Sequence, residues 1–154
     1  MNRRGHGWLW LLAGVLLFIW GNSLLPAEVS GAISGWLHGL LKEGLPKGAA
    51  SGGDRLLRKI AHFTEFALLG AVLLRLLRTR EERLLVAWLL SLACGIFAAC
   101  LDELLQHFSP GRSPQLGDVC IDAAGVLTGT LLCLIITIIG KTKTNKSTIG
   151  GKQS

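Results

Sequence analysis

Ionisable and amide side chains interrupt the apolar segments of this chain at a few related positions, and these side chains could do chemistry. They occur at the start of one apolar segment, the end of the next and the start of the last: His62, Glu65, Asp102, Glu103, Gln106, His107, Asp118 and Asp122. Such groups are costly inside a membrane, so each one is a functional-site hypothesis. Carboxylates and imidazoles transfer protons or hold cations, whereas the nearby Lys59 and Arg112 can hold an anion.

Helical spacing predicts that these groups converge. Three pairs lie three or four residues apart and can share a helix face: His62 with Glu65, Glu103 with Gln106, and Asp118 with Asp122. Gly125 and Gly129 continue the last of these faces and would let a neighbouring helix approach closely. We therefore expect one polar site at one end of a helix bundle.

The two cations have both a binding and an ordinary interpretation. Arg112 lies in a short connection, 109–117, that contains two prolines and two glycines and could hold its guanidinium over the polar site. An arginine fork suits a carboxylate or a phosphate. Alternatively, Arg112 forms a salt bridge to Asp102, Glu103 or Asp118, and Lys59 extends its amine from a helix end toward water.

Catalysis and metal binding have weaker support in the sequence. His62, Glu65 and Glu103 are candidates for general acid–base chemistry, but no nucleophile motif accompanies them, so enzyme activity stays open. Metal centres in helical bundles use Glu-x-x-His pairs, and the step from Glu103 to His107 is one residue longer. We therefore expect no metal and no cofactor.

The elements that must position these residues are apolar and helical. Half of the 154 residues are hydrophobic (50%), only 17% are charged, and the mean hydropathy is +0.48, which excludes a disordered chain. Four apolar segments, about 8–25, 60–77, 84–105 and 119–139, are each long enough to cross a membrane as a helix. The net charge of +6 is spread between these segments, so we expect no nucleic-acid partner. The prediction is an all-α membrane protein with four transmembrane helices.

Charge asymmetry predicts the orientation of the bundle. Ten lysines and arginines lie on the side that holds both termini and the turn at 75–83, against six on the side of the polar site. The more basic side is expected to be cytoplasmic, which makes the polar site external. Helical spacing of apolar residues within 26–58 also predicts a short amphipathic helix in the first external loop, lying on the membrane or capping the bundle. The basic segment 141–154 is expected to be a disordered cytoplasmic tail outside the 1–140 bundle.

Several motifs together resemble a known family. These are Lys59-x-x-His62-Phe63 with Glu65-Phe66, Asp102-Glu103-x-x-Gln106, Pro110-Gly111-Arg112, Asp118, and Gly125-x-x-x-Gly129. In this order they resemble the VanZ-like family of bacterial membrane proteins, many of which carry Asn where this chain has Asp122. The resemblance implies a small multi-helix plasma-membrane protein associated with low-level resistance to the glycopeptide teicoplanin. It supplies no settled biochemical activity.

The sequence thus favours an outer-face site that binds or modifies an anionic cell-envelope component. Its expected partners are the lipid bilayer and an anionic lipid or a lipid-linked envelope precursor. The predicted ligand-binding residues are Lys59, His62, Glu65, Asp102, Glu103, Gln106, Arg112, Asp118 and Asp122. Two alternatives remain: a proton- or cation-coupled transporter, and a structural subunit of an envelope complex in which the same charges pair only with one another.

Overall fold

The described part of the chain is entirely helical. The computed structural model describes residues 3–42, 53–81, 83–112 and 115–150. Within these ranges five helices follow one another without a strand, namely α1 (Arg3–Ser23), α2 (Ala27–Lys42), α3 (Gly53–Leu77), α4 (Leu84–His107) and α5 (Leu116–Gly150). This confirms the predicted all-α class and the short helix between the first two apolar segments.

Three helices in the described ranges are long and apolar enough to cross a membrane: Leu56–Leu77, Leu84–His107 and Leu116–Ile139. Many of their large apolar side chains are exposed, including Leu85, Phe97 and Ile136. A water-soluble protein rarely exposes so much apolar surface, whereas lipid accommodates it. Helix α1 is not among the three. A fourth span therefore stays a prediction.

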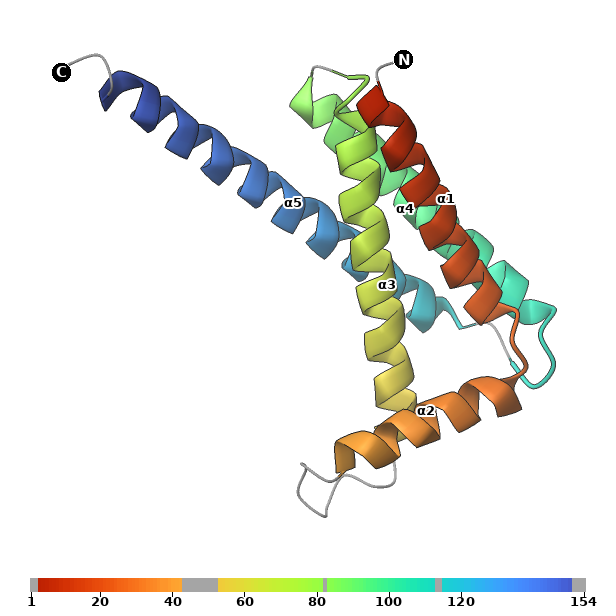
Figure 1. The fold of residues 1–154 in the computed structure, drawn as a ribbon. Helices are drawn as coiled ribbons and strands as arrows, with labels where there is room; N and C mark the ends of the chain where they lie inside the picture. Colours follow the sequence, from red (N-terminus) through yellow and green to blue (C-terminus); the bar gives the residue numbers. More distant parts are fainter. Residues whose placement is uncertain (1–2, 43–52, 82, 113–114, 151–154) are drawn as a thin grey trace.

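Glycines allow α3 and α5 to cross in close contact, as Figure 1 shows near the middle of the molecule. A Cβ atom at Gly125 would meet the Phe63 carbonyl oxygen, and one at Gly129 would meet the Ala67 carbonyl oxygen. From the other side, a Cβ at Gly70 would lie 2.5 Å from the Val126 carbonyl oxygen. The predicted role of the α5 glycines is confirmed: only residues without a side chain fit this crossing.

The core on the polar-site side of the bundle is made by four helices. Ile19 of α1, Phe66 and Leu69 of α3, Ala99 of α4 and Val126 of α5 are all fully buried and pack into one cluster. Helix α1 therefore packs against the other helices, whether or not it spans the membrane.

Helix α2 lies across the end of the bundle at which α1 stops and α3 starts (Figure 1). Its first residue is tied to the connection between α4 and α5, because the Ala27 amide donates to the Pro110 carbonyl oxygen at 3.1 Å. Gly111 has a φ of 76°, a left-handed backbone conformation that favours glycine. A Cβ atom at this position would meet the Ala27 methyl group. The Trp36 side chain of α2 is exposed (68%), so α2 itself presents apolar surface.

Helix α5 is longer than its apolar segment. It continues to Gly150, so residues 141–150, which we expected to be disordered, are helical in the structure. Extending an existing helix adds one hydrogen bond per residue without a new nucleation step, and no proline interrupts this segment. Residues 151–154, the rest of the predicted tail, lie outside the described residues.

Candidate functional site

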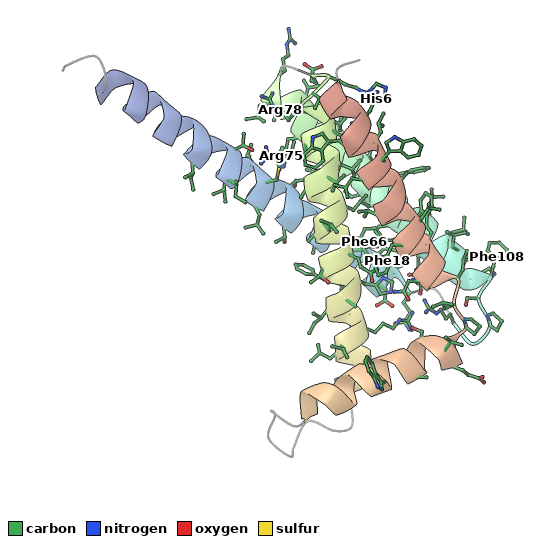
Figure 2. The ribbon with its side chains drawn as sticks, in the orientation of Figure 1. His6, Phe18, Phe66, Arg75, Arg78 and Phe108 are labelled. Carbon is green, nitrogen blue, oxygen red and sulfur yellow. The ribbon has the colours of Figure 1, made fainter. Side chains whose placement is uncertain are left out.

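The polar residues predicted from the sequence meet where α1 and α4 end and α3 and α5 begin. Figure 2 shows this region near Phe108, whereas His6, Arg75 and Arg78 lie at the opposite end of the bundle. An all-helical bundle brings them together because antiparallel neighbours place the end of one helix beside the start of the next. The functional roles of these residues are predictions, whereas the structure gives their positions and contacts.

His62, Asp102 and Asp122 form a buried group on three different helices. As a whole residue His62 is 8% exposed, and both aspartates are fully buried. The His62 Nδ1 atom lies 3.6 Å from Asp122 Oδ1 and 3.8 Å from Asp102 Oδ2. Both distances are too long for a hydrogen bond. Neither oxygen of Asp122 has a hydrogen-bond partner among the described residues.

Asp102 is held in place by donors from two helices. Ser23 Oγ, at the end of α1, donates to Asp102 Oδ2 at 2.8 Å, and Gln106 Nε2, one turn further along α4, donates to the same oxygen at 3.0 Å. The side-chain oxygen of Gln106, Oε1, in turn accepts from Arg58 Nη2 at 2.9 Å. A chain of hydrogen bonds therefore runs from Arg58 to the buried carboxylate and leaves Asp102 Oδ1 unpartnered.

The two predicted glutamates face different partners. Glu65 Oε1 accepts from Asn22 Nδ2 at 3.2 Å, and Glu103 Oε1 accepts from the Gln115 backbone amide. The three candidates for acid–base catalysis, His62, Glu65 and Glu103, are therefore not joined to one another by hydrogen bonds within the described residues.

The two predicted cations differ in how far their charges are paired. Lys59 Nζ lies 3.6 Å from Asp118 Oδ1, which is an ion pair at the rim of the site. Arg112 makes none of the salt bridges considered from the sequence: its Nη2 donates to the Asn22 carbonyl oxygen at 3.3 Å, and its buried Nε and Nη1 have no hydrogen-bond partner among the described residues. Burial, followed by repulsion from Arg58, lowers the pKa of Arg112, but a guanidinium remains protonated in proteins.

Four contributors were missed from the sequence. Arg58 was counted only for its charge, and its position one residue before Lys59 was the available signal. Asn22 and Ser23 are the polar residues that close the first apolar segment, which was treated only as a span. Gln115 lies in the connection that holds Arg112, and nothing in the sequence pairs its amide with Glu103.

Two adjoining hollows open at this site. The first, about 250 Å³ and mostly polar, is lined by three cations together with His62, Asp118 and Asp122. Those cations are Arg58, Lys59 and Arg112. The second, about 570 Å³ and mostly apolar, lies between α1, α2 and α3, and its lining includes Leu17, Phe18 and Leu57. Arg58 and His62 line both hollows, so the cationic and the apolar space adjoin at these two side chains.

The apolar helices and the buried polar end define a helical membrane protein. The family follows from comparison with known families. The VanZ/LLP1 family model matches residues 8–137, and the chain therefore belongs to the VanZ/LLP1 family. This confirms the resemblance that the motifs predicted. Neither the curated proteins nor the solved structures include a match to the chain.

Proposed function

We propose that this VanZ/LLP1-family membrane protein binds an anionic amphiphile of the bacterial cell envelope, with the charged head in the polar hollow. The observation that carries the proposal is Arg112: two of its guanidinium nitrogens are buried without a hydrogen-bond partner among the described residues, and Arg112 lines a hollow that Arg58 and Lys59 also line. Buried donors are nearly always satisfied, so unpaired donors beside a hollow favour a ligand that accepts from them.

The chemistry of the lining favours a phosphate or a carboxylate as the head group. Arginine presents a planar fork to such groups, and hydrogen bonds between charged partners are the stronger ones. Lys59 shares its charge with Asp118, whereas the hydrogen bond of Arg58 within the described part of the chain goes to the neutral Gln106. Two guanidinium groups and one partly paired amine thus supply the positive charge for an anion.

The apolar hollow supports a lipid rather than a free anion. It adjoins the polar hollow at Arg58 and His62, and its apolar lining comes mainly from α1 and α3. An amphiphile could place its head among the cations and its chain against Leu17, Phe18 and Leu57. An anionic phospholipid and a lipid-linked cell-wall precursor both have this chemistry.

The charge asymmetry and the family both support a proposal for the location. We propose that four helices span the bacterial plasma membrane, that both termini are cytoplasmic, and that the site faces outward. Ten of the sixteen lysines and arginines lie on the side opposite the site, which supports this orientation. The VanZ-like resemblance further supports a link between ligand binding at this face and low-level teicoplanin resistance.

Binding of a lipid phosphate by the purified protein tests the proposal. We expect the Arg112→Gln variant to bind phosphatidylglycerol or a polyprenyl phosphate about 10–100-fold more weakly, because a charge-assisted hydrogen bond contributes about 1.5–3 kcal/mol. Titration in detergent, followed by native mass spectrometry, measures the affinity. Arg75→Gln, at the other end of α3, is the matched control and should bind like the wild type.

The phenotype is tested in cells that express each variant at the wild-type level. We expect Arg112→Gln to remove any protection against teicoplanin, whereas Arg75→Gln retains it. Unchanged binding and unchanged susceptibility in Arg112→Gln would together refute the proposal.

A further inference from the structure

The buried group His62, Asp102 and Asp122 has a geometry that the anion site does not explain. Each residue offers one ligand atom, and the three atoms lie within 4.8 Å of one another. They come from α3, α4 and α5, and all three residues are buried. Imidazole nitrogen and carboxylate oxygen are both common ligands of divalent metal ions in proteins.

The distances suit a shared ion better than direct contact. If His62 donated to either aspartate, its Nδ1 would lie within about 3.2 Å of the oxygen. Both aspartate oxygens are further from His62 Nδ1 than that, at 3.6 Å for Asp122 Oδ1 and 3.8 Å for Asp102 Oδ2. Two ligands that each lie about 2.1 Å from one tetrahedral ion are themselves about 3.4 Å apart.

The charges also lack compensation by the protein. Asp122 is fully buried, and neither of its oxygens accepts a hydrogen bond from the described residues. Within the same residues, no lysine or arginine lies within ion-pair distance of Asp102 or Asp122; the cation in range of each is His62, provided that it is protonated. A buried carboxylate without a partner is expensive, and a bound cation would neutralise both carboxylates at once.

We propose that His62, Asp102 and Asp122 coordinate one divalent transition-metal ion of the Zn²⁺ or Mn²⁺ class. Ser23 and Gln106 orient Asp102 by donating to its Oδ2, which is the support that metal-ligating carboxylates commonly receive. His62 and Asp122 also line the polar hollow, so the open coordination position faces that space. The ion would there face the head group of the proposed amphiphile, and this last point alone rests on the proposed function.

The sequence predicted no metal, because the step from Glu103 to His107 within one helix does not match the Glu-x-x-His pair of helical-bundle metal centres. The three ligands lie 40 and 20 residues apart along the chain, on three helices. Such a group has no spacing motif and becomes visible only when the helices are packed.

Metal binding by the full-length protein tests the inference. The protein is purified in detergent with an affinity tag that contains no histidine, treated with a chelator, and titrated with Co²⁺ as a spectroscopic substitute for Zn²⁺. We expect about one equivalent of Co²⁺ with visible ligand-field bands, and displacement of Co²⁺ by Zn²⁺. Loss of a ligand in Asp122→Asn or His62→Ala should weaken binding by more than about tenfold, since even loss of a supporting residue costs about 10–100-fold.

Two matched controls separate this site from its surroundings. Glu28→Gln removes an exposed carboxylate of α2, and His107→Ala removes an exposed imidazole, both at the same end of the bundle; both variants should bind Co²⁺ like the wild type. Thermal unfolding without metal verifies that each variant is folded. Absence of stoichiometric Co²⁺ or Zn²⁺ binding by folded wild-type protein, or equal weakening in the controls, would overturn the inference.

The same variants test the proposed anion binding independently of the metal binding. Arg112→Gln should retain the Co²⁺ bands while it loses the lipid phosphate. If Asp122→Asn loses Co²⁺ but the wild type does not bind the lipid phosphate, the metal site stands and the proposed function is refuted.

Discussion

At the scale of single residues, the site depends on a few hydrogen bonds to buried carboxylates. Asp102 is fully buried and receives donors from Ser23 and Gln106, which places α1, α4 and the buried group in one network. Ser23 itself is 1% exposed, so water cannot replace its hydroxyl without rearrangement. Hydrogen bonds to charged groups in such positions contribute more than neutral ones.

This network predicts the effect of a single hydroxyl. Ser23→Ala should lower the free energy of unfolding by about 1–3 kcal/mol, because Asp102 would lose a donor that nothing replaces. Thermal or denaturant unfolding in detergent measures the change. Ser91→Ala is the matched control: Ser91 is equally buried, but its hydroxyl donates to the Ala87 carbonyl oxygen of its own helix, so we expect a change within about 0.5 kcal/mol. An equal loss in both variants would contradict the assigned role of Ser23.

At the scale of elements, the crossing of α3 and α5 sets the distance between His62 and Asp122. Gly125 and Gly129 lie one and two turns beyond Asp122, on the face of α5 that contacts the α3 backbone. Without a driving force from water, helices in a membrane associate through such close contacts. The glycines therefore act on the site, although neither of them lines a hollow.

The crossing predicts opposite results for two glycines of the same helix. Gly129→Ala should destabilise the protein by about 1–3 kcal/mol, because its Cβ would meet the Ala67 carbonyl oxygen. Gly117→Ala has nothing within 4 Å of its Cβ and should be neutral or slightly stabilising, since alanine is the better helix former. Unfolding of both variants under the same conditions gives the comparison. Similar stabilities would refute the packing role of Gly129.

At the scale of the whole molecule, the buried ionisable groups of the described residues concentrate at one end of the bundle. Away from the site, the hydroxyls of Ser91, Thr128, Thr130 and Thr137 donate to carbonyl oxygens of their own helices. Such hydroxyls offer no free donors for a continuous polar path, which disfavours a transporter. The Arg112 nitrogens without a partner among the described residues favour ligand binding over a purely structural role, in which the charges would pair with one another.

The orientation can be tested on intact cells. In a variant without native cysteines, Glu28→Cys on α2 should react with a membrane-impermeant maleimide, because α2 lies at the end that carries the site. Thr79→Cys, in the turn between α3 and α4, should react only after the membrane is permeabilised. The physical reason is the excess of lysine and arginine at the Thr79 end. The reverse pattern would place the site in the cytoplasm.

Residue type and periodicity alone determined much of this protein. Apolar segments of membrane-spanning length gave the helices, because a backbone inside lipid must satisfy its own hydrogen bonds. The order of the polar residues along antiparallel segments predicted that Lys59, His62 and Asp122 would gather at one end. Gly125 and Gly129 predicted a close contact between two helices, because glycine has no side chain to keep the backbones apart. The partner helix was not predicted.

Only the tertiary structure decided which of these groups are partners. Local spacing paired His62 with Glu65, but packing placed His62 beside Asp102 and Asp122 and turned Glu65 toward Asn22. Within the described residues, packing also left Arg112 without the predicted salt bridge to Asp102, Glu103 or Asp118. The physical reason is that helical periodicity fixes which residues share a face, whereas the rotation and crossing of whole helices determine what that face meets.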